Sequence, residues 1–248
     1  GQLGDGTNTN RTTPIQIGTA NNWNKVAAGG HYTLAIKNDG TLWGWGANNF
    51  GQLGDGTYTN KNVPVQIGTS NNWQSIDVRG GHSVALKTNG TLWTWGRNFY
   101  GQLGDGTTTS SNTFHKVKLN GDGDYLENIV QIAAENNTSH VLTADGSVYS
   151  YGYNYYGQFG NNTTTDESAN PYPVKMQKVS NIIQITAGEQ HISMLDADGS
   201  VWSTGYNGYG QFGIGTADTY NVLPTQMKDT KGSILYGVKE IASGTYHT

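Results

Sequence analysis

The stretch Gly1-Gln2-Leu3-Gly4-Asp5-Gly6-Thr7 decides how this chain folds, because it keeps returning. It recurs unchanged at Gly51–Thr57 and Gly101–Thr107, and in altered form at Gly157–Gly160 and Gly210–Gly213. We call each copy a marker loop. The copies start at residues 1, 51, 101, 157 and 210, so the successive starts are 50, 50, 56 and 53 residues apart. Such a period is typical of repeat architectures, and we predict one repeat-built domain over residues 1–248.

Each unit contains four short apolar runs separated by turn signals. In the first unit, Thr13–Ile17 contains a proline, whose missing backbone donor favours an edge strand. Small residues follow at Lys25–Gly29, alternating residues at His31–Ile36 and a tryptophan-rich run at Thr41–Gly46. Asn38-Asp39-Gly40 is typical of a hairpin turn. The pattern predicts an all-β fold of four-stranded antiparallel sheets, a β-propeller; the alternative is a β-solenoid, whose coils usually have shorter periods.

Two stretches of the unit carry a family resemblance. Ala27–His31 reads Ala-Ala-Gly-Gly-His, and Asp39–Gly46 reads Asp-Gly-Thr-Leu-Trp-Gly-Trp-Gly, with Asn48 and a marker loop after it. This pattern resembles the repeat of the regulator of chromosome condensation family, and it recurs four to five times over essentially the whole chain. That family forms propellers, typically with seven blades. The resemblance implies that the alanine-rich strand lies innermost and the proline-containing strand outermost.

That strand order makes the two ends of the chain unlike. The chain opens on an outer strand, Pro14–Ile17, and ends on an inner strand, Val238–Ala242. We therefore predict four complete blades and a partial fifth. An outer and an inner strand are too far apart to share hydrogen bonds. We expect an open arc of a larger ring, or a ring finished by other chains, and we expect the chain to be a fragment or a processed piece.

The repeated glycines are predicted to be structural, because glycine supplies positive φ and close backbone approach. Leu3 is expected to fill space between blades, and Gln2 and Asp5 to bond the loop itself. No Lys-Ser/Thr follows the loop, so a phosphate-binding loop is disfavoured. Calcium binding is disfavoured too, because each unit offers one carboxylate where calcium takes six to eight oxygens. The glycines concerned are Gly1, Gly51, Gly101, Gly157 and Gly210.

The histidines also recur, each opening a strand after a small-residue turn. Equivalent positions on separate blades are spread around an axis, which disfavours a shared metal ion or an acid–base site. We predict that each histidine satisfies a turn of its own blade. We expect no metal and no cofactor. The histidines concerned are His31, His82, His140 and His191.

Aromatic residues fall into a buried and an exposed class. Trp43, Trp45 and their counterparts alternate along a strand and are expected to fill the space between sheets. Tyr153, Tyr155 and Tyr156, together with Tyr206 and Tyr209, are expected to be exposed and available to a protein partner or a sugar.

Antiparallel strands place alternate connections on opposite faces of a propeller. Marker loops and histidine turns should share one face, and the hairpins and the outer-to-inner crossovers the other. The lengths of the units differ largely in the crossovers, Leu119–Asn128 and Lys228–Tyr236. Because variable loops on a rigid scaffold usually carry binding, we predict the crossover face as a partner surface. Its candidate residues are Asp122, Asp124 and Tyr125.

Composition excludes several classes of function. The net charge is −4 without a long basic run, so nothing supports nucleic-acid binding. The absence of cysteine excludes disulfides, thiolate metal sites and a cysteine nucleophile. No apolar run approaches the roughly 20 residues that span a bilayer, and no secretory signal is visible.

The leading hypothesis is a non-enzymatic protein-interaction scaffold from a bacterial secreted or cell-surface protein. No Ser–His–Asp order, carboxylate pair or metal signature indicates an enzyme. The Asn/Thr/Tyr/Gly-rich composition favours an extracellular or cell-surface location, with the cytoplasm as the alternative. The resemblance adds two alternatives: guanine nucleotide exchange on a small GTPase, as in the founder of the family, and enzyme inhibition, as in a related bacterial β-lactamase inhibitor. Exposed tyrosines add a third, carbohydrate binding.

Overall fold

A computed structural model describes residues 1–248 as sixteen strands in four four-stranded antiparallel sheets, with no helix. Each sheet is one blade, and its strands are hydrogen-bonded in chain order. No helix is present that is long and apolar enough to span a bilayer. The strands are β1 (Trp23–Ala28), β2 (Tyr32–Lys37), β3 (Leu42–Gly46) and β4 (Lys61–Gln66) in blade 1; β5 (Trp73–Arg79), β6 (His82–Lys87), β7 (Leu92–Gly96) and β8 (Ser111–Lys116) in blade 2; β9 (Ile129–Ala134), β10 (Thr138–Thr143), β11 (Val148–Gly152) and β12 (Asn170–Lys175) in blade 3; and β13 (Ile182–Ala187), β14 (His191–Asp196), β15 (Val201–Tyr206) and β16 (Tyr220–Gln226) in blade 4.

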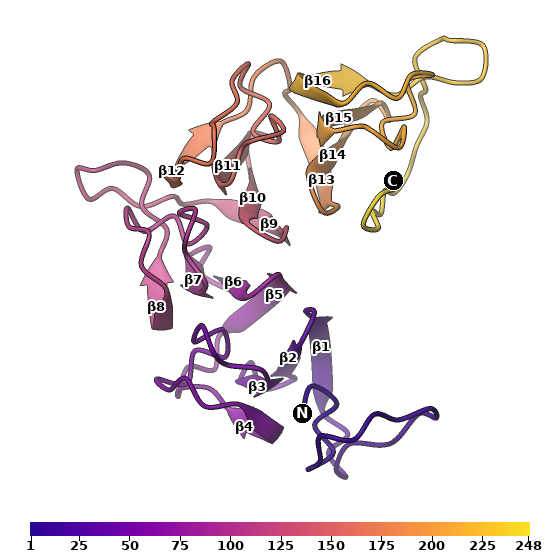
Figure 1. The fold of residues 1–248 in the computed structure, drawn as a ribbon. Coiled ribbons are helices and arrows are strands. Elements are labelled where there is room, and N and C mark those ends of the chain that lie inside the picture. The colour runs from indigo at the N-terminus through magenta and orange to yellow at the C-terminus, as the bar shows by residue number, and fades with distance from the viewer.

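The four blades stand side by side around a central hollow (Figure 1). The strands β1, β5, β9 and β13 face the hollow, and β4, β8, β12 and β16 lie on the outside. The arc is open on one side, between β1 and the C-terminal segment. The predicted propeller and the predicted order, with the alanine-rich strand inside and the proline-containing strand outside, are confirmed.

The cores lie between neighbouring blades, as the alternating aromatics predict. Trp95 and Tyr151 are fully buried, and the indole nitrogen of Trp95 donates to the carbonyl of Gln52 in the preceding marker loop at 2.8 Å. Leu53 and Leu103, the third residues of two marker loops, are also fully buried. Burying a side chain of this size contributes about 1.5–3 kcal/mol, so these two marker loops help to hold neighbouring blades together. The expectation that Leu3 fills space between blades is wrong, because no blade of the structure precedes its loop and the side chain is 40% exposed.

The two ends of the chain differ from the prediction. Neither Thr13–Ile17 nor Val238–Ala242 forms a strand. A strand needs a ladder partner, and neither segment has the adjacent strand of its own blade to pair with. The last segment nevertheless lies along β13, because the Gln184 side chain accepts from the Ile241 amide at 3.0 Å and donates to its carbonyl at 2.9 Å. It thus lies beside β13 as the start of a fifth unit.

Candidate interaction surface

The marker loops are built around one buried asparagine in each unit. In blade 1, Asn48 accepts from the amide of Leu53 at 2.9 Å and donates to the carbonyl of Thr57 at 3.0 Å. The same two bonds recur in blade 2, where Asn98 contacts Leu103 and Thr107. Asn154 and Asn207 repeat the acceptor bond with Phe159 and Phe212. One side chain therefore sets the shape of each of the four loops that follow a blade's third strand.

The marker loops that follow β3, β7 and β11 also join their blade to the outer strand of the next one. The amide of Gly56 donates to the carbonyl of Asn112 in β8 at 3.0 Å, and the Asn112 side chain donates back to the Gly56 carbonyl at 2.9 Å. Gly51 has a φ of +77°, and a Cβ there would lie 2.4 Å from the Asn112 Cα. Gly101 and Gly157 make the same close approach to Pro171 and Val222. These contacts give Gly51, Gly101 and Gly157 the structural role that was predicted for them. At Gly210 a Cβ would meet only the Thr216 carbonyl, at 4.0 Å, so only its φ of +75° requires glycine.

The acid of the marker loop is used within the molecule. Asp55 accepts from the amide and hydroxyl of Thr57 at 2.9 and 2.7 Å and lies 3.3 Å from the Lys61 ammonium. Asp5 makes the same bonds to Thr7 and pairs with Arg11 at 2.6 Å. Hydrogen bonds from Thr7 and Arg11 lower the pKa of Asp5 to about 2. Both carboxylates thus hold their own loops.

The loop glutamine positions an aromatic residue just before the loop. Gln52 accepts from the amide of Phe50 at 2.9 Å, and Gln102 accepts from that of Tyr100 at 2.9 Å. Gln158 and Gln211 do the same for Tyr156 and Tyr209, at 3.1 and 3.0 Å. The repeat therefore places one aromatic ring per blade on the face of the propeller that carries the marker loops, which we call the marker-loop face.

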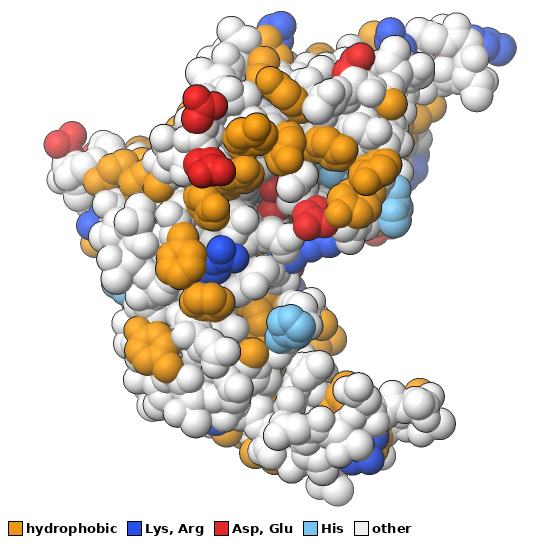
Figure 2. All heavy atoms as spheres, viewed as in Figure 1, with side chains coloured by type: hydrophobic (Ala, Val, Ile, Leu, Met, Phe, Trp, Pro, Cys, Tyr) orange, Lys and Arg blue, Asp and Glu red, His pale blue; other side chains and the backbone are white.

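These rings and their neighbours form a band across that face, which we call the aromatic arc. Ring centroids follow one another at 4.9 Å (Tyr100–Tyr153), 6.0 Å (Tyr153–Tyr155), 5.0 Å (Tyr155–Tyr156), 5.2 Å (Tyr156–Tyr206), 5.8 Å (Tyr206–Tyr209) and 4.9 Å (Tyr209–Tyr246). Phe50 and Phe99, 5.7 Å apart, extend the arc across blades 1 and 2. Figure 2 shows hydrophobic side chains gathered on this face around the hollow.

Several rings of the arc are open to solvent. Phe99 is 52% exposed, Tyr155 42%, Tyr209 67% and Tyr246 47%. Partial burial and the neighbouring Tyr156, Tyr100 and Glu167 raise the pKa of Tyr153 to about 12, so this hydroxyl stays a hydrogen-bond donor at physiological pH. A group of exposed, mutually supported tyrosines is the kind of surface that protein partners bind.

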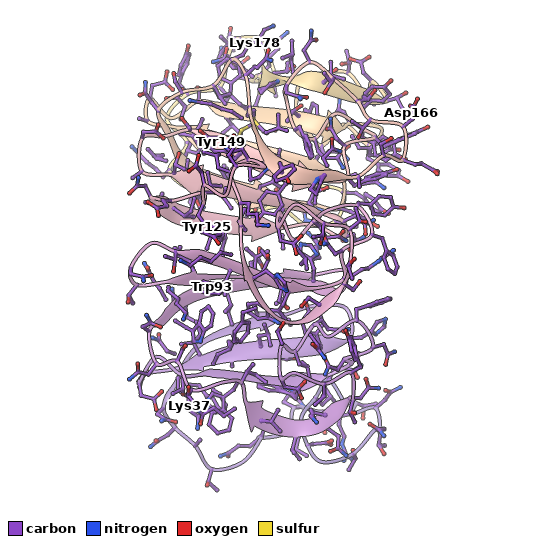
Figure 3. All side chains as sticks on the ribbon, turned by 90° about the vertical axis from the view of Figure 1, so that its left-hand side faces the viewer. Lys37, Trp93, Tyr125, Tyr149, Asp166 and Lys178 are labelled. Atoms are coloured by element: carbon purple, nitrogen blue, oxygen red, sulfur yellow. The ribbon has the colours of Figure 1, made fainter.

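The sequence-predicted site residues divide between the two faces. Tyr153, Tyr155 and Tyr156 come together in the arc. Tyr125 lies on the crossover face, where the Lys116 ammonium sits 5.0 Å from its ring. Figure 3 shows Tyr125 along one side of the molecule with Lys37 and Lys178, and Asp166 on the other side.

Asp122 and Asp124 lie in the same crossover as Tyr125. Their loop is closed internally, because Asn120 accepts from the Asp122 amide at 2.9 Å and donates to the Asp124 carboxylate at 3.1 Å. The six candidate residues therefore belong to two separate surfaces.

The histidines are less equivalent than the sequence suggested. His82 and His191 pair with Gly96 and Gly205, but the residue that pairs with the corresponding Gly152 is Thr138, so His140 lies two positions further along. His31 lies one position earlier and is exposed. The prediction of one equivalent histidine per blade is therefore wrong in register. The turns before these strands have the same length, since Ala28 pairs with Thr33, Val78 with Ser83, Ala134 with Ser139 and Ala187 with Ile192, so the histidine itself stands at a different position of the repeat in blades 1 and 3.

Three of the histidines are buried and bonded. His82 contacts the hydroxyl of Ser139 in the next blade at 3.0 Å, and His191 contacts that of Thr248 at 3.1 Å. Burial lowers the pKa of His82 to about 3 and that of His191 to about 4, so both rings are neutral in the fold. These bonds run between units, not within one turn as predicted.

Blade 3 holds a serine, a histidine and a glutamate in contact. His140 lies 2.8 Å from the Ser150 hydroxyl and 3.1 Å from the Glu135 carboxylate. All three side chains are at most 1% exposed, and burial raises the pKa of Glu135. A substrate has no access to this group, so it holds the fold and performs no nucleophilic chemistry.

The central hollow is a cavity of about 800 Å³ lined by the inner strands. Arg79 crosses part of it and donates to the carbonyls of Ala187 and Gly188 in blade 4, at 3.0 and 2.8 Å. Asp77 accepts from the amide of Ala134 at 2.8 Å. The polar groups of the cavity are thus largely engaged in holding blade to blade.

Sequence reasoning missed part of the arc. Phe50, Phe99 and Tyr100 belong to it, and so do Arg97 and Tyr246. A usable signal existed, because the residue just before the marker loop is aromatic in four successive units.

Comparisons with known proteins agree with this geometry. A family model described as the RCC1-like domain matches residues 1–248. The chain is 35% identical over 119 residues to a human probable E3 ubiquitin-protein ligase, HERC4, covering 48% of this chain and 11% of the relative. It is 32% identical over 123 residues to the Xenopus laevis regulator of chromosome condensation, covering 49% of this chain and 28% of the relative.

A solved structure shares the fold. Prp20p of Saccharomyces cerevisiae, whose structure was described with its binding to Gsp1p and histones, superposes with a TM-score of 0.76 at 24% identity. The match covers 89% of this chain and 54% of that one. The chain therefore spans about half the length of this structural relative and less of the sequence relatives.

Proposed function

Because this chain belongs to the RCC1-like domain family, we propose that it is a non-enzymatic protein-binding module whose contact surface is the aromatic arc. The observation that carries the proposal is the continuous series of rings from Tyr100 to Tyr246, held in place by the glutamines and asparagines of the repeat. Tyrosine offers a large amphipathic contact area and loses little conformational entropy when it binds, which is why it is enriched at binding hot spots.

Two features favour a protein over a sugar. Most neighbouring rings meet edge to face, so the arc presents edges, hydroxyls and partly covered faces instead of one flat platform. The rings also extend over all four blades, an extent that suits the 20–30 residues a side of a standard protein interface. A sugar would use only a few of them.

Guanine nucleotide exchange is the second candidate. One relative is named regulator of chromosome condensation, and the structure of Prp20p was described with its binding to Gsp1p. That likeness supports protein binding on this fold. Faster release of a labelled guanine nucleotide from a small GTPase would establish exchange.

The predicted bacterial, secreted source gains no support, since the relatives described above are all eukaryotic.

A displayed library of random peptides selected on the intact chain tests the protein-binding function. Each enriched peptide is then measured against a Tyr155→Ala/Tyr209→Ala variant and a Tyr125→Ala variant. A hot-spot tyrosine is worth about 2 kcal/mol, which is about 30-fold in affinity. The arc variant lacks two tyrosines and should lose at least that much, while the crossover variant keeps its affinity. Peptides that lose affinity only in the Tyr125→Ala variant would place binding on the crossover face and refute the proposal.

A further inference from the structure

The aromatic arc has two halves that differ in charge. In the phenylalanine half, the guanidinium of Arg97 lies 5.6 Å from the Phe50 ring centre and 5.0 Å from that of Phe99. The tyrosine half begins at Tyr100 of blade 2 and runs over blades 3 and 4. It consists of Tyr100, Tyr153, Tyr155, Tyr156, Tyr206, Tyr209 and Tyr246, with Tyr220 packed beside Tyr156 at 6.4 Å.

Comparison of the repeats shows that the tyrosine half lacks the cation found in the phenylalanine half. Arg97 directly follows Gly96, and the residues that follow the equivalent Gly152 and Gly205 are Tyr153 and Tyr206. The position that supplies the cation in blade 2 therefore supplies another ring in blades 3 and 4. The molecule itself shows that the aromatic residues of this face accept a guanidinium between them, and in the tyrosine half no arginine or lysine of the chain takes that place.

Acidic side chains surround the tyrosine half. Glu189 accepts from the Asn136 side chain at 2.9 Å, and its carboxylate raises the pKa of the neighbouring Tyr246. Asp166 and Glu167 are exposed in the loop beside Tyr153, and Asp218 is exposed next to Tyr220. Figure 2 shows carboxylates beside the aromatic band in this part of the face.

The basic residues of blades 3 and 4 are on the opposite face. Lys175 ends β12 opposite Tyr149, and Lys178 lies with Tyr149 and Tyr125 on the crossover side in Figure 3. Lys228 and Lys231 belong to the crossover after β16. Lys239 follows Val238, which is bonded to the hairpin glycine Gly199. Arg79 reaches blade 4 from the central hollow, but its guanidinium is bonded to the carbonyls of Ala187 and Gly188. The tyrosines therefore lie beside carboxylates, and no lysine or arginine of the chain lies over their rings.

We propose, building on the protein-binding function above, that the tyrosine half of the arc binds an arginine-bearing, cationic polypeptide segment. Arginine stacks on tyrosine faces and forms bidentate bonds with carboxylates, so one side chain uses both features of this surface. Lysine has the charge without the planar fork and should bind less well. A nucleic acid would be repelled by the same carboxylates.

Fluorescence anisotropy with labelled peptides tests the partner chemistry. The probes are a peptide of alternating glycine and arginine, and two peptides of the same length with lysine or glutamate in place of arginine. The arginine peptide should bind best, the lysine peptide several-fold less tightly, and the glutamate peptide not at all. Binding should weaken between 0.1 and 1 M salt, where the Debye length falls from about 10 to about 3 Å.

Variants locate the site. Asp166→Asn/Glu167→Gln/Glu189→Gln should weaken the arginine peptide by roughly tenfold, which is about 1.4 kcal/mol. The matched control, Asp122→Asn/Asp124→Asn, removes acids from the crossover face and should have no effect. Thermal unfolding of both variants checks that they are folded.

Three outcomes overturn the inference: equal binding of the arginine and glutamate peptides, a loss that is as large in the control as in the acid-face variant, or no binding of the arginine peptide. Library peptides that require Tyr155 and Tyr209 but carry no cationic residues would also overturn it, while the proposed function would stand. If no library peptide requires the arc, both proposals fail.

Discussion

Replacing Gly51 by alanine should destabilise the fold far more than replacing Gly56, although the two glycines have nearly the same backbone conformation. Their φ angles are +77° and +78°. At Gly51 an added Cβ would lie 2.4 Å from the Cα of Asn112 in the next blade, whereas at Gly56 it would meet nothing within 4 Å. Gly56→Ala therefore measures the cost of the conformation alone.

The expected magnitudes follow from these two terms. A left-handed conformation costs a residue with a Cβ about 1–2 kcal/mol, and the stiffer unfolded chain returns about 0.4–1 kcal/mol. Gly56→Ala should thus cost about 1 kcal/mol. Gly51→Ala adds overpacking against backbone, typically about 1–3 kcal/mol, because the Asn112 Cα cannot rotate away. The difference between the variants should be about 2 kcal/mol.

Guanidinium unfolding followed by tryptophan fluorescence is a suitable assay, since the chain has 7 tryptophans. With an m-value of about 5 kcal/mol/M, the two midpoints should differ by about 0.4 M. Equal midpoints for the two variants would show that the marker loop does not pack against the next blade as described. A changed m-value would instead report a less compact native state.

Three further predictions concern the scaffold. Asn48→Ala should cost about 2–3 kcal/mol in unfolding free energy, because it leaves the buried Leu53 amide unpaired. The neighbouring Asn49 is exposed, so Asn49→Ala should cost almost nothing, and equal losses would contradict the role given to Asn48. Gln184→Ala removes both bonds to Ile241, so hydrogen exchange measured by mass spectrometry should speed up over residues 238–248 and not in β9; unchanged exchange there would mean that Gln184 does not hold this segment. The free energy of unfolding should fall as the pH drops below about 6.5. His82 (folded pKa about 3) and His191 (folded pKa about 4) stay neutral in the fold, whereas the same histidines bind protons in the unfolded chain. The expected loss is about 2 kcal/mol per histidine by pH 5. Urea midpoints between pH 7.5 and 5 check the last point, and His82→Gln should flatten the slope; a wild-type profile that is already flat would contradict it.

The sequence contains most of the information about the fold because the same local signals recur in every unit. The hairpin at Asp39-Gly40 and the alternating Trp43 and Trp45 specify a strand pair, and their repetition specifies a ring of such pairs. What the sequence does not contain is the effect of missing neighbours. Thr13–Ile17 has the composition of an edge strand, yet without a partner ladder it stays irregular.

Side-chain partners across blades were harder to predict for a related reason. The bond between His82 and Ser139 joins residues 57 positions apart, and no local pattern distinguishes it from a bond within the turn. The histidine register failed because the turns have one length in all four blades while the histidine occupies different positions of the repeat, which only the strand pairing reveals. The sequence singled out the tyrosines of the arc but overstated their exposure, because Tyr153, Tyr156 and Tyr206 are half-buried against neighbouring rings. The contacts of Tyr246 with Tyr209 and Glu189 depend on how the last segment lies against blade 4.

The geometry of the marker loop separates residues that hold the scaffold from residues free to vary. The buried asparagine and the loop glutamine make the same bonds in every unit, so substitution there disturbs the blade. The residues around them are not so constrained: the position after the third-strand glycine is Ala47, Arg97, Tyr153 or Tyr206 in successive units. A change at this position alters the charge and ring content of the marker-loop face at little cost to the fold. The acidic, tyrosine-rich character of blades 3 and 4 is therefore set by positions that packing leaves open, which is the pattern expected of a surface shaped for a partner.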